Sequence, residues 1–344
     1  MPARLRVNRD ALAANYLRYR TAVAGACGAV VKADGYGLGA EETAAVFERL
    51  GCRHFFVATA AEGLALRKVL QNSVIYVLDG VVPETARPLA GAGLVPVVNH
   101  ERQLAAWAPF RDRDVAVHVD TGMNRLGFPV GVPASVFEGF QVSLLMTHLA
   151  CADDPAHPLN EIQLRRFAEV AERFPGIATS IGNSAGSLLA ERYHGDLARP
   201  GIGLYGGNPW LNEPNPARPV ATLEAAVVQT REVAAGESVG YGATWSSRKA
   251  RRLAVLGIGY ADGLPRSLSN CGEAVVAGKR CPFVGRVSMD LTAIDVTGAQ
   301  VEAGDWVELF GAELPVDEVA RKAETIAYEL LTGISPRVQR VYEG

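Results

Sequence analysis

The chain has 344 residues, a formal net charge of −3 and 49% hydrophobic residues. A chain of this length exceeds the size at which one hydrophobic core usually stops growing, so we expect two domains. The near-neutral charge argues against nucleic acid and membrane surfaces as partners, and no apolar run approaches the ~18 residues of a membrane span.

The cysteines and the first residues predict a cytoplasmic location. The number of cysteines is odd, and no pair has the C-x-x-C spacing of a zinc or redox site. The start, MPARLRVNRD, lacks the apolar stretch of a secretory signal. We therefore expect reduced thiols, as in cytosolic proteins. The cysteines are Cys27, Cys52, Cys151, Cys271 and Cys281.

Up to about residue 206, short apolar runs alternate with segments that have helical spacing. Segments such as AEETAAVFERLG and PLNEIQLRRFAEVAERF are typical of amphipathic helices. Eight strands alternating with helices over roughly 200 residues favour an α/β fold, an N-terminal (β/α)8 TIM-type barrel. The pattern alone leaves an open doubly wound sheet as the alternative. The expected strands lie within residues 28–34, 54–60, 73–80, 94–100, 114–120, 142–149, 177–184 and 197–206.

The pattern changes after a Pro-rich stretch at residues 208–220. The later runs are strand-like and are separated by Gly or Asp turns, and only residues 316–333 have a clear helical pattern. We therefore predict a barrel domain over residues 9–218 and a mostly β C-terminal domain over residues 219–344. We expect residues 1–8 to pair with the C-terminal domain.

In a barrel of this kind, function gathers at the carboxyl ends of the strands. The expected ends carry a lysine, a histidine, two arginines, a tyrosine and Gly-rich turns, a set that suits an anionic, carbonyl-bearing ligand. In chain order these ends are Lys32–Tyr36, Asp120–Arg125, Thr147–His148, Asn183–Ser184 and Arg199–Gly201.

Lys32 is the sharpest single signal. Lysine is scarce, and only Lys32 and Lys68 occur in the barrel half. Lys32 follows the apolar run ACGAVV, and burial there would lower its pKa and leave the free amine that Schiff-base chemistry requires. Taken alone, a strand-end lysine that extends to water is an equally simple interpretation.

The segment RPGIGLYGGNP (199–209) has the features of a phosphate-binding loop. Gly201 lets the backbone approach a ligand closely, and successive N–H groups can cradle a phosphate. Barrels often bind phosphate after strands seven and eight, and Ser184 would add a donor. For this stretch alone, an ordinary Gly-rich turn remains the alternative.

The second half of the chain contains one candidate catalytic residue, Tyr260, and lacks the histidines of a typical metal site. Tyr260 ends a buried strand in LGIGYADGLPR, where a packing role is the simpler interpretation unless a partner keeps the hydroxyl able to exchange protons. None of the six histidines falls in the second domain. A metal site there would depend on carboxylates or cysteines, so we expect none.

Taken together, these segments resemble the alanine racemases over nearly the whole chain. One such motif would be weak evidence, but nine occur in the family's order. The matching stretches are VVKADGYGLG (30–39), HVDTGMNRLGF (118–128), THLACAD (147–153), GNSAGS (182–187), RPGIGLYG (199–206), VGYGATW (239–245), GIGYADGLPR (257–266), GRVSMD (285–290) and ISPRVQRVY (334–342).

The resemblance implies a pyridoxal 5′-phosphate (PLP) enzyme that interconverts L- and D-alanine with two bases. Lys32 would hold PLP as a Schiff base and act as one of the bases. Tyr260 would be the base on the opposite face, and it would reach into the active site of the other subunit. The site would then be complete only in a homodimer, which would contain two such sites.

The resemblance also implies binding roles. Arg199 would face the pyridine nitrogen and keep it unprotonated, which disfavours transamination, and His148 would hydrogen-bond Arg199. Arg125 and the backbone N–H of the partner's Met289 would bind the substrate carboxylate. The phosphate would be held by Tyr36, Ser184, Gly201, Ile202 and Tyr342.

One departure from the family pattern concerns His118. Many relatives have a lysine here that becomes carbamylated and helps to orient the substrate-binding arginine, here Arg125. A histidine cannot form that carbamate in the same way. Either His118 helps to orient Arg125 by hydrogen bonding, or a bound anion takes the place of the carbamate. We expect a lower substrate affinity than in those relatives.

Other functions on a similar plan are less well supported. Related decarboxylases place an acid, not Arg199, opposite the ring nitrogen, and metal-dependent aldolases would need histidines in the second domain. A serine or broad-specificity racemase remains open, because one methylene in a pocket changes affinity by only about 1–3 kcal/mol. A non-catalytic PLP-binding barrel would not need a second domain that carries Tyr260.

Overall fold

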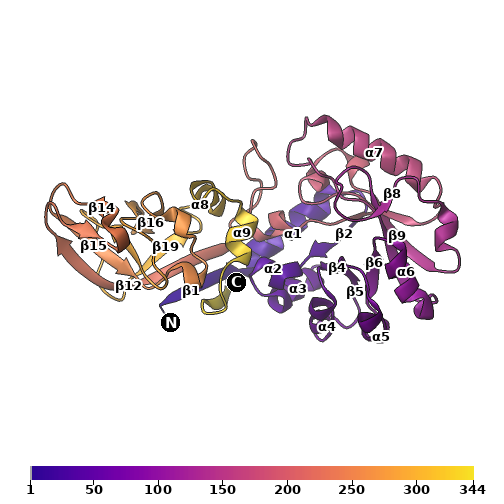
Figure 1. The fold of residues 1–344 in the computed structure, drawn as a ribbon, viewed down its shortest axis with the longest axis horizontal. Coiled ribbons are helices and arrows are strands. Elements are labelled where there is room, and N and C mark those ends of the chain that lie inside the picture. Colours follow the sequence, from indigo (N-terminus) through magenta and orange to yellow (C-terminus); the bar gives the residue numbers. More distant parts are fainter. Residues whose placement is uncertain (1) are drawn as a thin grey trace. The chain divides into compact units, whose positions relative to one another are not determined.

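The computed structural model describes residues 2–344, which form two compact units. The barrel unit comprises Leu12–Leu204 and Asn208–Ala217. The β-rich unit comprises the residues through Ala11, Tyr205–Gly207 and Arg218–Gly344. In Figure 1 most of the barrel unit runs from indigo to magenta, and most of the β-rich unit from orange to yellow. No helix in the described part of the chain has the length and apolar character needed to cross a bilayer.

The strands of the barrel unit are parallel, and each pairs with its neighbour along the chain, in the order β3, β4, β5, β6, β7, β9 and β10. Most of their residues are buried and apolar, as expected for parallel strands that are covered on both faces. The strands are β2 (Ala26–Cys27), β3 (Ala29–Val30), β4 (His54–Val57), β5 (Val74–Val77), β6 (Val95–Val98), β7 (Asp114–Asp120), β9 (Gln141–Met146), β10 (Ala178–Ser180) and β11 (Leu197–Ala198), with a short β8 (Phe128–Pro129) beside β7.

Strand β11 closes the sheet into a barrel. It pairs in parallel with β2, and the N–H groups of Gly28 and Val30 donate to the carbonyls of Ala198 (2.9 Å) and Pro200 (3.0 Å). On its other side, the N–H of Arg199 donates to the carbonyl of Gly182 at 2.7 Å. The first and last strands are therefore joined, which confirms the predicted barrel and excludes the open sheet.

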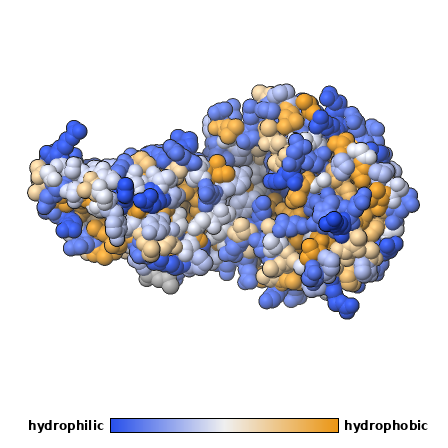
Figure 2. Space-filling model, in the orientation of Figure 1, coloured by the Kyte–Doolittle hydropathy of each residue, from blue (hydrophilic) through white to orange (hydrophobic). Residues whose placement is uncertain are grey.

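The helices of the barrel unit form where the sequence supplies an amphipathic stretch, and some begin at a capping residue. In α4, for example, Thr59 and Glu62 form a capping box. Figure 1 shows α4, α5 and α6 on one side of strands β4, β5 and β6, and Figure 2 shows small hydrophobic patches among hydrophilic residues on the visible face of this unit. The helices are α1 (Arg9–Ala22), α2 (Lys32–Tyr36), α3 (Ala40–Arg49), α4 (Ala60–Arg67), α5 (Pro83–Gly91), α6 (Glu101–Trp107) and α7 (Pro158–Ala171).

The β-rich unit is built around the long strand β12, which pairs with β1, β15 and β19. Strand β1 also pairs in parallel with β20, the last strand of the chain. The strands are β1 (Ala3–Asn8), β12 (Ala221–Val233), β13 (Ser238–Val239), β14 (Trp245–Ser246), β15 (Arg251–Leu256), β16 (Glu273–Val276), β17 (Lys279–Pro282), β18 (Thr292–Asp295), β19 (Trp306–Phe310) and β20 (Gln339–Glu343). This arrangement confirms the mostly β second domain.

Two elements differ from the sequence-based expectation. The helical pattern over 316–333 is two helices, α8 (Val316–Lys322) and α9 (Ala327–Thr332), because Glu324 adopts a left-handed φ of 57° and ends the first helix. The eighth barrel strand stops at Ala198, because Pro200 has no N–H for a sheet ladder. A short 3-10 helix (Ile202–Tyr205) follows it.

Candidate active site

The carboxyl ends of the barrel strands gather the charged residues singled out from the sequence. Lys32 follows β3, Arg125 lies in the loop after β7, His148 follows β9 and Arg199 follows β11. They are close enough to act on one another electrostatically. Burial lowers the pKa of His148 well below its usual range, and the charges of Arg199, Arg125, His118 and Lys32 lower it further.

The backbone turns sharply at Lys32 and fixes where its side chain starts. Ala33, Asp34, Gly35 and Tyr36 have φ values of 52°, 53°, 61° and 55°, so the segment after Lys32 is a left-handed turn. Such a run is costly for residues other than glycine and persists only where the surroundings enforce it. At Gly35 a Cβ would lie 2.7 Å from Thr43 Oγ1, so only glycine fits there.

Glu62 is one of the groups that enforce this turn. Its Oε1 accepts the N–H of Ala33 at 2.8 Å, and its Oε2 accepts the N–H of Ala58 at 2.7 Å. Burial lowers the pKa of Lys32, and Arg125 lowers it further, whereas Glu62 and Asp79 oppose the shift. The net effect increases the fraction of free amine near neutral pH.

A tight cradle forms where Tyr36 meets the glycine-rich segment after β11. A Cβ on Gly201 would lie 2.2 Å from the Tyr36 hydroxyl, so the close approach requires glycine. Ser184 Oγ accepts the N–H groups of Gly201 (2.7 Å) and Gly203 (3.3 Å). Backbone N–H groups and two hydroxyls thus meet around Gly201, where only glycine fits, a donor set that suits a phosphate.

Arg199 is 3% exposed, yet it has several acceptors. Its guanidinium donates to Ser180 Oγ and to the Thr147 carbonyl (2.7 Å), and it lies 3.4 Å from His148 Nδ1. Burial lowers the pKa of Arg199 to about 9. Because Nδ1 accepts from a cation, His148 is held neutral with its proton on Nε2.

Asp120 shapes the loop that carries Arg125, a role that its place at a predicted strand end did not reveal. Its carboxylate accepts the N–H groups of Gly122 (2.9 Å), Met123 (2.9 Å) and Arg125 (3.2 Å). Partial burial opposes ionisation, but these backbone donors hold the pKa of Asp120 below its usual range. An aspartate two residues before a glycine is a turn signature that could have identified this role.

Gln163 is a second residue of the candidate site that the sequence pattern does not predict. It is fully buried on α7, and its Nε2 donates to the His148 carbonyl (3.0 Å) and to Thr121 Oγ1 (3.1 Å). Its Oε1 accepts the N–H of Ala150 at 2.8 Å. One amide therefore joins two strand ends of the candidate site. No sequence signal marks it, because a glutamine on a helix is ordinarily solvated.

Three of the predicted residues belong to the β-rich unit. The N–H groups of Tyr260 and Ala261 donate to the carbonyls of Ser288 and Met289, both at 3.0 Å, so the segments that carry Tyr260 and Met289 lie side by side. Their side chains are 43% and 54% exposed. Tyr342 lies on β20, apart from this pair in sequence, and the guanidinium of Arg9 lies 5.4 Å from its ring centroid.

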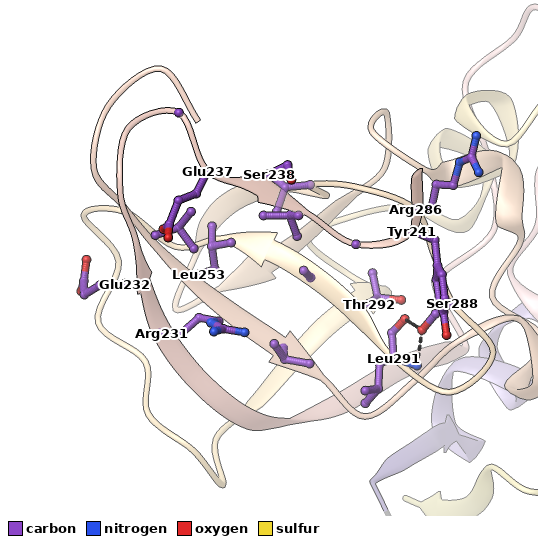
Figure 3. A pocket seen from close by; sticks show the side chains of 17 residues that line it. Arg231, Glu232, Glu237, Ser238, Tyr241, Leu253, Arg286, Ser288, Leu291 and Thr292 are labelled. Atoms are coloured by element: carbon purple, nitrogen blue, oxygen red, sulfur yellow. Dashed lines mark hydrogen bonds between the residues drawn. The ribbon is translucent and has the colours of Figure 1, made fainter. Parts of the chain in front are cut away.

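The β-rich unit also contains a pocket of about 930 Å³ beside β12, β13, β15 and β18 (Figure 3). Ser288 and Leu291 line it and hydrogen-bond to each other, as the dashed lines show. Tyr241 and Arg286 lie along its side nearest to Ser288. No lysine or histidine lines this pocket, so it offers no group for Schiff-base chemistry and is not the candidate active site.

Comparisons with known proteins cover the whole chain. The family "Alanine racemase, N-terminal domain" matches residues 7–209, and "Alanine racemase, C-terminal domain" matches residues 220–342. An alanine racemase of Methylobacterium sp. (strain 4-46) is 45% identical over 99% of this chain and 97% of that protein. A biosynthetic alanine racemase of Agrobacterium fabrum is 45% identical over 99% and 94%.

Solved structures of alanine racemases resemble this chain in fold as well as in sequence. Alanine racemase from Bartonella henselae, described with covalently bound pyridoxal phosphate, superposes with a TM-score of 0.94 at 36% identity and full coverage of both chains. The biosynthetic alanine racemase of Pseudomonas aeruginosa gives a TM-score of 0.92 at 34% identity over 100% and 99%. Sequence and fold are thus shared from end to end, and the chain belongs to the alanine racemase family.

Proposed function

We propose that this protein is a PLP-dependent racemase that interconverts L-alanine and D-alanine with two bases, Lys32 and Tyr260 of the partner subunit. The observation that carries the proposal is the strand-end cluster of the barrel: a lysine with a lowered pKa, a cradle of backbone N–H groups and hydroxyls around Gly201, and a buried arginine. PLP has an aldehyde, a phosphate and a ring nitrogen, and each has a matching group in this cluster.

The residues that would hold PLP are those of the barrel rim together with Tyr342. Lys32 would bind the aldehyde carbon, and Tyr36, Ser184, Gly201, Ile202 and Tyr342 would hold the phosphate. Arg199 would donate to the ring nitrogen, and His148 would support it. Since an arginine gives up its proton reluctantly even when buried, the ring nitrogen would stay unprotonated.

When bound, PLP stabilises the electron pair that stays on the substrate Cα after a proton leaves. The chain's own residues would do the rest. The Lys32 amine would take or return the Cα proton on one face, and the Tyr260 hydroxyl would do the opposite on the other face. The guanidinium of Arg125 and the N–H of Met289 would bind the substrate carboxylate and keep Cα between the two bases.

We also propose a homodimer in which Tyr260 and Met289 complete the site of the partner subunit. The support is their exposure: both side chains lie at the surface of the β-rich unit, together with Tyr241 (73% exposed) and Leu291 (43% exposed). A group of exposed apolar side chains of this kind is typical of an interface. A two-fold axis would give two identical sites for each dimer.

The predicted domains would have different roles in this reaction. We propose that residues 9–218 form the PLP-binding domain, that residues 219–344 form the domain that supplies the second base, and that residues 1–8 belong functionally to the latter. We further propose a cytoplasmic location, which the five free thiols support.

The test is conversion of L-alanine to D-alanine by the purified protein with PLP, with L-serine as comparison substrate. Rapid conversion of alanine and slow conversion of serine would support the proposal. Equal rates would indicate a broad-specificity racemase, and a bound chromophore without turnover would indicate a barrel that only binds PLP.

Subunit mixing tests the shared site. Lys32→Ala and Tyr260→Phe proteins are co-expressed with different affinity tags, and the mixed dimer is isolated. One of its two sites would then contain both native bases, so we expect about half of the wild-type activity from two nearly inactive parents. A mixed dimer that stays inactive would contradict the shared site.

A further inference from the structure

A chain of buried amides runs along the rim of the barrel beside the proposed site. It connects the ends of β5 and β6 to β7 through Gln103 of α6, Asn99 and His118, which are 9%, 3% and 8% exposed. The proposed mechanism uses none of these three side chains. Buried polar groups are costly unless they are satisfied, so their arrangement requires an explanation.

The surroundings of Asn99 determine which way its amide points. Its Nδ2 faces the carbonyl oxygens of Val97 (2.9 Å) and Leu78 (3.3 Å), which can only accept. Its Oδ1 therefore faces His118 and lies 2.8 Å from Nδ1. An amide oxygen accepts but does not donate, so His118 must carry a proton on Nδ1.

Gln103 in turn holds Asn99. Its Nε2 donates to the Asp79 carbonyl at 2.6 Å, which leaves Oε1 to accept the backbone N–H of Asn99 at 2.8 Å. The fit is close: a Cβ on Gly80 would lie 2.4 Å from Gln103 Oε1, and the φ of Gly80 is +81°. Fixed backbone carbonyls thus set the orientation of both amides, and neither amide can flip. We call the chain of Gln103, Asn99 and His118 the relay.

Burial, together with two neighbouring arginines, keeps His118 neutral. Burial lowers its pKa to about 4, Arg199 and Arg125 lower it as well, and Asp120 opposes them. His148 is also close enough for His118 to affect its pKa. A neutral imidazole with its proton on Nδ1 has a lone pair on Nε2, which can accept one N–H donor.

Elimination identifies the donor. The guanidinium of Arg199 already donates to Ser180, Thr147 and His148. The Lys32 amine and the guanidinium of Arg125 both have no hydrogen-bond partner within residues 2–344. Lys32 is assigned to the cofactor in the proposed function, which leaves Arg125, whose charge acts on His118. Arg125 is therefore the cation that an Nε2 lone pair at this position can orient.

We propose that Asn99 is a positioning residue: it holds His118 with the proton on Nδ1, so that the Nε2 lone pair orients the guanidinium of Arg125. Gln103 supports Asn99 in this task. The inference rests on the proposed function in one respect, since Arg125 is there assigned to the substrate carboxylate. It goes beyond that function by explaining how His118, which carries no negative charge, can orient Arg125.

The tautomer can be measured without turnover. The holoenzyme is labelled with ¹⁵N-histidine, and the spectrum of His118→Gln identifies the signals of His118. We expect a neutral ring at pH 7 with the proton on Nδ1. A proton on Nε2 would overturn the proposal, whether or not the enzyme racemises alanine.

Asn99→Asp sharpens the measurement. A carboxylate beside Nδ1–H stabilises the imidazolium, so the pKa of His118 should rise by about 1–3 units. His54 provides the matched control in the same spectrum. Burial lowers its pKa too, and its Nδ1 lies 3.3 Å from the Tyr76 hydroxyl, at the amino end of β4 and outside the relay. A shift of His54 as large as that of His118 would contradict a specific effect.

Kinetics then test the link to Arg125. His118→Leu removes the acceptor, and we expect KM for L-alanine to rise about tenfold with little change in kcat, because a uniform binding interaction is lost. Asn99→Leu should have the same effect through the imidazole. His118→Gln keeps an acceptor oxygen and should restore KM to within about threefold of the wild-type value.

These outcomes separate the inference from the proposed function. If the wild-type protein does not racemise alanine, the proposed function fails while the tautomer measurement still stands. If it does racemise alanine and KM is unchanged in His118→Leu, the positioning role is wrong. Should Asn99→Leu fail to fold, the His118→Leu and His118→Gln pair decides the question alone.

Discussion

The two units present their candidate residues in opposite ways. In the barrel, Lys32, Arg199 and His148 lie at strand ends where burial lowers their pKa values, and neighbouring charges add to the shift of Lys32 and His148. In the β-rich unit, Tyr260 and Met289 are fixed through their backbones, and their side chains are exposed. One unit encloses its groups and alters their acidity, and the other presents its groups at the surface.

This difference follows from architecture. Parallel strands that are covered on both faces end in a crowded rim, where a lysine or arginine loses water but gains fixed carbonyls and carboxylates. Exposed side chains of an antiparallel unit remain hydrated. They can take part in catalysis only when another surface covers them and excludes the water. We therefore expect substitutions in the barrel to act within one subunit, and substitutions at Tyr260 to act through the partner.

The largest effect is expected for Lys32→Ala, because one change removes both the covalent link to PLP and one base. Racemisation should fall by roughly 10⁴-fold, and the visible absorbance of the lysine-bound cofactor should disappear after gel filtration. Lys68→Ala, an exposed lysine at the end of α4, is the matched control and should leave both measurements unchanged. Retained activity in Lys32→Ala would remove Lys32 from the mechanism.

Tyr260→Phe should have the next largest effect. It should distinguish the contribution of the β-rich unit from that of the barrel unit. The hydroxyl is lost while the barrel is untouched, so we expect PLP binding to persist and racemisation to fall by about 10²–10³-fold. Cofactor absorbance and circular-dichroism assays of alanine conversion measure the two properties. Full activity in this variant would exclude Tyr260 as the second base.

Gly201→Ala tests the cradle. The added Cβ would lie 2.2 Å from the Tyr36 hydroxyl, so one of the two segments must move. Because overpacking of this kind costs about 1–3 kcal/mol, we expect the PLP dissociation constant to rise about tenfold. Gly131→Ala, which has open space around it, is the control. Equal PLP affinity in both variants would show that the cradle does not hold the phosphate.

The smallest effect concerns the pH dependence of cofactor capture. Lys32 reacts with PLP as the free amine, which predominates above its pKa, and burial and Arg125 lower that pKa. The rate at which the apo protein binds PLP should therefore rise with pH around a midpoint below that of a free lysine. Arg125→Ala removes one cause of the lowered pKa and should move the midpoint upward by less than about one unit.

Arg113→Ala, an exposed cation before β7, serves as the control for this shift. Stopped-flow absorbance of PLP addition over a pH series measures the midpoint in all three proteins. A midpoint that moves downward in Arg125→Ala would contradict the electrostatic explanation.

The sequence by itself determined the alternation of strands and helices, the mostly β second domain and the family. Apolar periodicity and glycine-rich turns are local properties, so they can be recognised in one dimension. Lys32 and the segment RPGIGLYG (199–206) could be singled out in the same way, because a lone lysine after a buried run and a run of glycines are visible without contacts.

Only the tertiary structure decided how the barrel closes, where the helical pattern over 316–333 breaks and which buried side chains organise the site. Gln163 and Asn99 act through partners that are distant in sequence or that belong to other strands, and their amides have no local signature. The orientation of each amide depends on fixed carbonyls, and those are positioned only when neighbouring strands come together.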